Sequence, residues 1–317
     1  MKLTFEVWPN MPWGRLEAAG PAWNSWGDKP LGWCAERIAE CGYDGIDVIY
    51  PKILEEDYPR FVDEFPAKLR ELGLEFGYIG AHSTFVSPRH FDRERGIASF
   101  KNAVDAAADL GATSVCTLLG DGYYDPPLNI LLSRKDAWAQ AVRAVDEVAS
   151  YAADKGVNVS IELLQGSIVN RVPLLLRLIE EVDRDNVRAT VDTGTFYTTV
   201  KSFMDVKEAI RELGDLIDIV HVKDEIGLPS IVQTNHTWMG GGVVDFGEVR
   251  EALEEIGFSG YCSVEWEGWQ AGGTIGVGEP AGLGLADFDR VAVEAKEFLE
   301  EFGYRSTRDR EAQAGKE

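Results

Sequence analysis

Short apolar stretches alternate along the chain with longer stretches in which apolar residues recur every three or four positions. The first pair is LTFEVW at 3–8, with the alternation of a strand, and LGWCAERIAECG at 31–42, with the spacing of a helix. Further strands are expected at 45–50, 74–82, 112–120, 157–164, 187–193, 216–224 and 261–266. Further helices are expected near 57–72, 92–110, 135–155, 171–182, 203–213, 246–256 and 286–302, several of them ending at a glycine.

Eight consecutive strand and helix pairs favour an α/β fold, namely a single (β/α)8 TIM barrel. An open doubly wound sheet is the alternative, but it needs only about five or six such pairs and usually a glycine-rich first turn. No GxGxxG motif follows the first strand. No linker divides the chain, so we expect one barrel over 1–305 and a mobile polar tail over 306–317.

The connections after strands 1, 7 and 8 are unusually long, at 9–30, 225–243 and 267–285. Each follows a strand, so each is expected at the carboxyl face, where barrel enzymes bind substrate. The tryptophans here suit a lid that stacks on a sugar ring, with a plug packed on the barrel rim as the alternative. The candidate substrate-binding residues here are Trp8 at the end of strand 1, and His236, Trp238 and Trp269 in the long connections.

The chain carries 54 acidic and 31 basic side chains, which gives a formal net charge of −23. A field of that sign disfavours nucleic acid and anionic membrane surfaces as partners. The four cysteines lack CxxC spacing and are too few for a disulfide scaffold, which fits a reducing cytoplasm. The first residues do not form the apolar core of a signal peptide, and no run of about 20 apolar residues occurs. We therefore expect a cytoplasmic protein without a membrane segment.

Four ionisable residues interrupt apolar strands near their carboxyl ends, namely Glu162, Asp192, His221 and Glu265. Glu162 and Asp192 are 30 residues apart, and Asp192 and His221 are 29 apart, so their side chains recur at a similar depth on consecutive strands. Three carboxylates and an imidazole at one mouth would repel and dehydrate one another unless a cation lies between them. Oxygen ligands with one nitrogen suit a single divalent ion, with Mn²⁺ ranked first and Mg²⁺ or Co²⁺ as alternatives.

The chain resembles the xylose isomerase-like barrel superfamily, which includes ketose 3-epimerases, hydroxypyruvate isomerase and inosose dehydratase. The resemblance spans nearly the whole chain and is carried by IELL at 161–164, VDTG at 191–194, HVKD at 221–224, GGGVVDF at 240–246 and VEWE at 264–267. It implies that Glu162, Asp192, His221 and Glu265 bind a divalent metal. Many members have a histidine where this chain has Thr195, and ketose epimerases place an arginine after strand 7 where this chain has EIGLPS.

The candidate catalytic residues are Glu162, Glu265, His82 and Lys223. A metal polarises a sugar carbonyl and stabilises an enediolate, while one glutamate removes the proton and the other returns it. His82, after strand 3, is a candidate acid or hydroxyl ligand, and Lys223, two residues beyond His221, is a candidate oxyanion ligand or a salt-bridge partner. Asp47 on strand 2 is a candidate for lining the pocket. Asp245 is expected to cap the helix near Phe246 rather than to touch substrate.

The leading hypothesis is a metal-dependent isomerase or epimerase of an unphosphorylated ketose or polyol ketone, because no phosphate cradle is evident. A lyase of the inosose dehydratase or C-glycoside deglycosidase type is the alternative, since the same enediolate can expel a leaving group. A metal-dependent apurinic endonuclease is disfavoured because the chain has only four histidines and a strongly acidic net charge. A sugar-binding barrel without catalysis is a further alternative. The expected partner is a small carbohydrate. The sequence leaves open whether the protein forms a homo-oligomer or binds a partner subunit.

Overall fold

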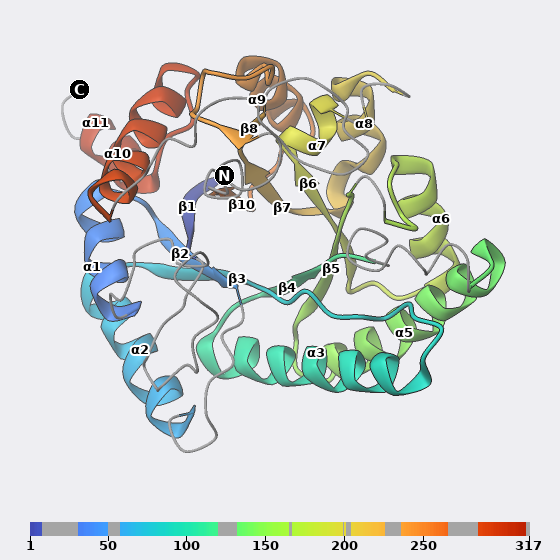
Figure 1. Cartoon of the computed structure of the whole chain (residues 1–317). Coiled ribbons are helices and arrows are strands. Elements are labelled where there is room, and N and C mark those ends of the chain that lie inside the picture. Colours follow the sequence, from blue (N-terminus) through green and yellow to red (C-terminus); the bar gives the residue numbers. More distant parts are fainter. Residues whose placement is uncertain are drawn as a thin grey trace.

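The computed structural model describes the following residues: 1–7, 31–49, 58–119, 132–164, 167–198, 200, 204–225, 236–265 and 285–314. Eight parallel strands close into a barrel in the order β1-β10-β7-β6-β5-β4-β3-β2, and helices surround it (Figure 1). The predicted (β/α)8 barrel is therefore confirmed.

The barrel strands match the expected apolar stretches to within a few residues. They are β1 (Lys2–Val7), β2 (Gly45–Ile49), β3 (Glu75–Gly80), β4 (Ser114–Thr117), β5 (Asn158–Glu162), β6 (Val187–Asp192), β7 (Ile217–Val222) and β10 (Tyr261–Val264). The surrounding helices are α1 (Leu31–Cys41), α2 (Tyr58–Leu72), α3 (His90–Leu110), α5 (Arg134–Ala153), α6 (Val172–Val182), α8 (Val206–Leu213), α9 (Phe246–Glu255) and α10 (Leu285–Glu301). A short 3₁₀ turn, Gly214–Leu216, leads into β7.

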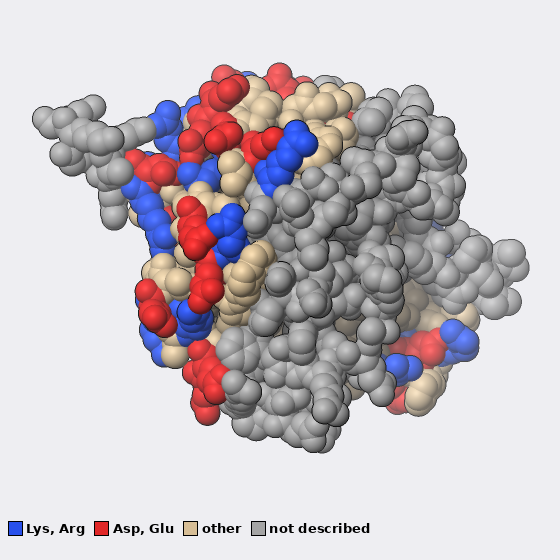
Figure 2. Space-filling view, turned by 60° about the vertical axis from the view of Figure 1, so that its left-hand side comes forward, with Lys and Arg blue, Asp and Glu red and all other residues tan. Residues whose placement is uncertain are grey.

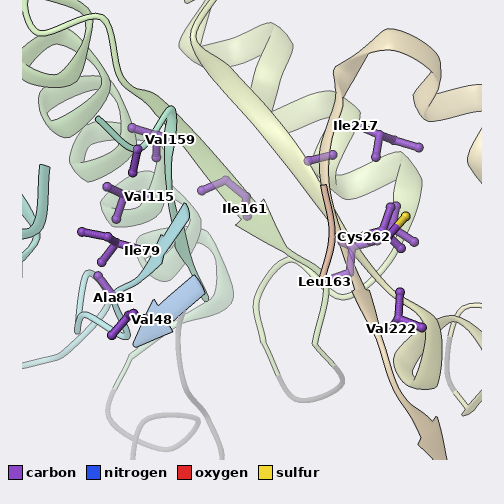
Figure 3. Close-up of a cluster of buried hydrophobic side chains, with 14 of the residues drawn as sticks. Val48, Ile79, Ala81, Val115, Val159, Ile161, Leu163, Ile217, Val222 and Cys262 are labelled. Carbon is purple, nitrogen blue, oxygen red and sulfur yellow. The ribbon is translucent and has the colours of Figure 1, made fainter. Parts of the chain in front are cut away.

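Alternation along the strands sends two kinds of side chain to the two faces of the barrel wall. Apolar residues such as Val115, Val159 and Ile161 point outwards and pack under the helices, where they join the main core (Figure 3). A separate buried cluster of Tyr78, Cys116 and Ile219 lies inside the barrel. The sequence alternation therefore builds an apolar layer outside the wall and leaves the interior available for polar side chains.

The structure contains elements that the sequence pattern did not indicate. A short helix, α7 (Thr193–Thr198), follows β6 at once. Part of the long connection after β7 forms a two-stranded antiparallel ribbon, β8 (Asp224–Glu225) with β9 (His236–Thr237). The remainder of that connection over 226–235, and most of the other two long connections, lie outside the described residues.

A further helix, α11 (Thr307–Ala314), forms within the polar segment that was expected as a tail. It has no apolar face, so the periodicity that reveals other helices is missing. Polar contacts hold it against the barrel: Arg308 donates to the carbonyl oxygens of Leu72 and Gly73 at 2.6 and 2.7 Å. Asp309 also pairs with Lys296 at 2.9 Å.

The described surface carries acidic and basic side chains interleaved on the face shown in Figure 2. Many of them form ion pairs between or along helices, such as Lys68 with Glu36 and Arg290 with Glu294. None of the helices in the described ranges combines the length and apolar character needed to traverse a bilayer.

Candidate metal centre

The four predicted ligand residues converge at the carboxyl end of the barrel because of strand register. Asp192, the last residue of β6, pairs directly with His221 on β7. Ser263 on β10 pairs with the same histidine, so Glu265, two residues later, points to the same interior one step higher. Glu162 closes β5 opposite Thr190, two residues before Asp192.

The four side chains form one compact, buried cluster. Each can offer one ligand atom such that all four atoms lie within 4.8 Å of one another. His221 Nδ1 lies 3.1 Å from Glu265 Oε2 and 3.5 Å from Glu162 Oε1. The side chains are buried, with Asp192 fully enclosed. The structure thus brings together all four residues that the register in the sequence singled out.

Burial and crowding shift the acid–base behaviour of the cluster. Burial raises the pKa of Glu162 from 4.5 to about 7, with the carboxylates of Glu265 and Asp192 adding to the effect and His221 opposing it. Burial alone lowers the pKa of His221, but the carboxylates of Glu265 and Glu162 outweigh it and raise the pKa well above its usual value. Without a cation, the cluster therefore retains protons that free side chains would release near neutral pH.

Lys223 supplies a positive charge to this cluster. Its Nζ lies 2.7 Å from Asp192 Oδ2 and 3.0 Å from Glu265 Oε2, and the side chain is buried. The residue follows β7 and lies two positions beyond His221, so both side chains enter the barrel from the same face of the strand. This ammonium offsets the charge of one of the three carboxylates in the cluster.

The residues present fit a divalent cation. Both ring nitrogens of His221 are buried without a well-formed hydrogen bond, although Nδ1 faces two carboxylates. Three carboxylate donors and one imidazole form a set that hard or borderline divalent ions accept. A cation between them also relieves the repulsion that raises the pKa of Glu162. The residues that would hold the ion are Glu162, Asp192, His221 and Glu265.

A buried pair beneath the centre, Glu6 and Tyr78, was not singled out from the sequence. The Tyr78 hydroxyl donates to Glu6 Oε2, and the Tyr78 ring stacks on the His221 imidazole with centroids 5.3 Å apart. Burial and the nearby Glu265 carboxylate raise the pKa of Glu6 well above its usual range. The available signal was a glutamate inside the apolar strand LTFEVW, on the same face as Thr4.

Two other predicted residues, His82 and Asp47, lie outside the ligand cluster. His82 lies two residues after β3, and its side chain is exposed and outside the ligand cluster. Asp47 is fully buried in the middle of β2 rather than at the strand end. It accepts hydrogen bonds from the Thr4 hydroxyl on β1 and from the Tyr78 backbone N–H on β3. The Asp47 carboxylate therefore links the two strands on either side of β2.

Trp238 packs against the core beside α10. With Lys223, Glu265 and Thr237 it lines a small cavity of about 40 Å³, and the Arg290 guanidinium lies 4.8 Å from its ring centroid. The backbone of His236 forms part of β9, whereas its side chain lies outside what the structure describes. Trp8 and Trp269 also lie outside the described residues.

Two further aspartates in the segment between β7 and α9 have structural partners. Asp224 accepts hydrogen bonds from the backbone N–H groups of Gly240, Gly242 and Val244 at 2.8 to 3.2 Å, and so closes the turn after the β8–β9 ribbon. Asp245 accepts from the N–H of Glu248 at 2.9 Å and caps α9, as the sequence predicted. These carboxylates are satisfied by neutral donors and differ in this respect from the ligand cluster.

The chain is similar to several known proteins in sequence and in fold. The chain is 26% identical over 232 residues to L-ribulose 3-epimerase of Mesorhizobium japonicum, covering 71% of this chain and 72% of the relative. It is 23% identical over 252 residues to inosose dehydratase of Histophilus somni, covering 74% and 81%. The structure superposes on D-psicose 3-epimerase from Clostridium cellulolyticum, solved with D-tagatose, with a TM-score of 0.70 over 95% of this chain and 99% of that one.

At 19% identity, that last likeness establishes the fold alone. The family model for xylose isomerase-like TIM barrels matches residues 35–299, which include every predicted ligand. The chain therefore belongs to the xylose isomerase-like TIM barrel family.

Proposed function

We propose that this protein is a divalent-metal-dependent isomerase or epimerase of an unphosphorylated ketose or polyol ketone. The observation that carries the proposal is the buried convergence of Glu162, Asp192, His221 and Glu265 at the carboxyl end of the barrel. The similarity to a ketose epimerase over 71% of the chain supports the same class of reaction. Mn²⁺ is the ion we propose first, because oxygen donors with one imidazole suit it.

A divalent ion held by these four residues supplies positive charge that polarises a substrate carbonyl and stabilises the enediolate formed by proton loss. The remaining chemistry falls to the side chains. Glu162 and Glu265 approach the imidazole of His221 from separate strands, β5 and the end of β10. Carboxylates on two sides of one centre can take a proton from one face of a carbon and return it to another.

Glu162 is the stronger candidate for the proton-accepting base. Within the described residues, its carboxylate faces the His221 imidazole rather than an ammonium, so it is less firmly paired than Glu265. Glu265 contacts Lys223 at 3.0 Å, which suits it to orienting the ammonium. Lys223, which lies beside both Asp192 and Glu265, is the candidate donor to an oxygen that becomes negative in the transition state.

The charge at the site favours a neutral substrate. Lys223 is already engaged by Asp192 and Glu265, and a divalent ion together with this ammonium balances the three carboxylates of the cluster, so these residues leave no excess positive charge for an anionic group. A phosphate group normally needs uncommitted cations or a helix N-terminus directed at it. We therefore propose that the substrate is an unphosphorylated carbohydrate.

Solvent exchange tests this proposal directly. Protein loaded with Mn²⁺ is incubated in D₂O with a panel of free ketoses and polyol ketones, and deuterium at the carbon next to the carbonyl is followed by NMR. Enolisation predicts exchange with at least one substrate, together with a new epimer or isomer. Glu162→Gln is expected to lose exchange almost completely while keeping the melting temperature of the folded barrel.

Glu181→Gln is the matched control for this substitution. Glu181 lies on α6 and pairs on the surface with Arg177 and Trp138, away from the cluster. This variant is expected to exchange at the wild-type rate. Binding of a ketose without exchange in the wild type would support a binding protein and contradict catalysis. Full activity of Glu162→Gln would remove Glu162 from the role of base.

Elimination is the second candidate, because the chain is similar to an inosose dehydratase over 74% of its length. The same proton abstraction gives loss of water when a hydroxyl lies β to the carbonyl. Mass spectrometry of the same incubations separates the two outcomes. A product lighter by one water supports the lyase, whereas a product of unchanged mass with exchanged deuterium supports the isomerase.

A further inference from the structure

A buried thiol lies directly below the metal centre. Cys116 on β4 pairs in register with Ser160 on β5, two residues before Glu162. Its Sγ lies 3.9 Å from Glu162 Oε2, and the side chain is only 2% exposed. Cys116, Glu162 and His221 together offer three ligand atoms that all lie within 4.8 Å of one another. This set shares Glu162 and His221 with the four-residue centre, and it has the Cys116 thiol in place of the other two carboxylates.

The spacing of this set suits a tetrahedral ion. Sulfur and carboxylate oxygen bound to one zinc ion at about 2.3 and about 2.1 Å lie about 3.6 Å apart at the tetrahedral angle. The separation of 3.9 Å between Cys116 and Glu162 is therefore close to what a shared ion requires. A thiolate, an imidazole and a carboxylate leave one tetrahedral position open.

The surroundings of the thiol also favour an ion. The Thr190 hydroxyl lies 3.3 Å from Cys116 Sγ and 2.7 Å from the Ser160 hydroxyl, so it can support a thiolate. The buried ring nitrogens of His221 have no well-formed hydrogen bond. One thiolate and one carboxylate neutralise a divalent charge fully, and Lys223 stays paired with Asp192 and Glu265. An ion can therefore bind either to this three-residue set or to the four-residue centre without leaving a large uncompensated charge.

We propose that Cys116, Glu162 and His221 form a second, deeper metal position that takes thiophilic divalent ions such as Zn²⁺ or Cd²⁺. Glu162 and His221 belong to both positions, so one ion occupies either the upper or the deeper one. On binding, Cys116 coordinates as the thiolate and its proton passes to solvent. An ion held there leaves Asp192 and Glu265 without metal, and so competes with Mn²⁺ and inhibits enolisation. That last consequence rests on the proposed function, whereas the deeper position itself does not.

Cadmium absorption tests the deeper position without any activity measurement. Metal-free wild-type protein titrated with Cd²⁺ is expected to develop the near-ultraviolet sulfur-to-cadmium charge-transfer band, saturating at one equivalent. Cys116→Ser is expected to abolish the band and to weaken Cd²⁺ binding by about 100-fold. Mn²⁺ affinity in the same variant is expected to change by less than about threefold, because hard ions favour the oxygen donors.

Two further variants locate the ion. Cys262→Ser is the matched control, because Cys262 is also buried but its Sγ faces the Met1 sulfur at 3.7 Å; it should keep the band. Asp192→Asn should lose Mn²⁺ affinity and keep the band. Absence of the band in the wild type, its persistence in Cys116→Ser, or its loss in Asp192→Asn would each overturn the proposal.

X-ray absorption of the wild type with one equivalent of Zn²⁺ covers the case in which Cys116→Ser fails to fold. One sulfur in the first shell supports the deeper position, and a shell of oxygen and nitrogen alone contradicts it. The proposed function can fail separately. A cadmium band that depends on Cys116, together with no exchange on any ketose, would retain this metal position and refute the enzymatic proposal.

Discussion

The two ends of the barrel interior both hold polar side chains, but they satisfy them in different ways. At the amino end, Asp218 accepts hydrogen bonds from the Ser114 hydroxyl and from Asn158 Nδ2, the latter at 3.2 Å. Both donors are neutral, and they come from β4 and β5. A carboxylate with such partners needs no further ligand, and it ties three strands together.

At the carboxyl end, the carboxylates face an imidazole, an ammonium and one another. Glu162 and Glu265 both approach His221, and Lys223 bridges Glu265 and Asp192. The cost of this crowding appears in the raised pKa of Glu162. The difference teaches that a buried acid signals function when its neighbours are other charges rather than neutral donors.

The largest expected contrast between the two ends is catalytic. Glu265→Gln removes a carboxylate from the cluster, and a neutral amide can neither accept a proton as a general base nor bind a cation as strongly. Deuterium exchange into substrate is expected to fall by about 10²- to 10⁴-fold. Asp218→Asn at the other end is expected to keep exchange within about twofold of the wild type, as distant substitutions usually do. Similar losses in both variants would contradict the assignment of function to the carboxyl end.

The pH dependence of stability gives the next largest effect. The pKa of Glu162 is raised from 4.5 to about 7 in the folded protein, so the native state binds more protons than the unfolded state between those values. The free energy of unfolding of the metal-free protein should therefore fall as pH rises through this window. The Glu162 contribution is on the order of 3 kcal/mol, from about 1.4 kcal/mol per pKa unit.

Asp47, whose pKa burial raises to about 6, contributes in the same direction. Denaturant unfolding at pH 5, 6, 7 and 8 measures the slope. Glu162→Gln should flatten it, and saturating Mn²⁺ should reverse it, because the ion binds the deprotonated carboxylates. A metal-free protein that gains stability from pH 5 to pH 8 would refute this account of the cluster.

Lys223→Met tests whether the Lys223 ammonium offsets part of the negative charge of the ligand cluster. Removing a cation beside Asp192 and Glu265 leaves the cluster more negative, so Mn²⁺ should bind about tenfold more tightly. Exchange should nevertheless slow, since the oxyanion donor is lost. Isothermal calorimetry and the exchange assay measure the two effects separately. Weaker Mn²⁺ binding would indicate that Lys223 chiefly holds the carboxylates in place.

The sequence predicted the barrel and the ligand set for a definite physical reason. Parallel strands repeat at nearly constant intervals, so polar residues at strand ends, such as Glu162 and Asp192, must meet at one mouth. Apolar alternation gave the strands, and glycine after helices gave many boundaries. These signals are local in the chain and need no knowledge of side-chain packing.

The features that were missed depend on contacts across the barrel. The stacking of Tyr78 on His221 joins β3 to β7, and no spacing in the chain reveals it. The helix α11 lacks an apolar stripe and is held by Arg308 and by the Asp309–Lys296 pair. The helix α7 is too short for a period to appear. Lys223 was placed on the correct strand face, but its two partners required the structure.

The smallest expected effect is the stability change in Asp218→Asn. The amide oxygen still accepts one hydrogen bond, but the charge-assisted bond from Ser114 is weakened, so the free energy of unfolding should fall by about 0.5–1.5 kcal/mol. Urea unfolding measures this change, and calorimetry with Mn²⁺ should give the wild-type dissociation constant. A weakened Mn²⁺ affinity would show that the two ends of the barrel are coupled. An unchanged affinity with a modest loss of stability would mean that a carboxylate inside the barrel serves structure at one end and binds metal at the other, according to its neighbours.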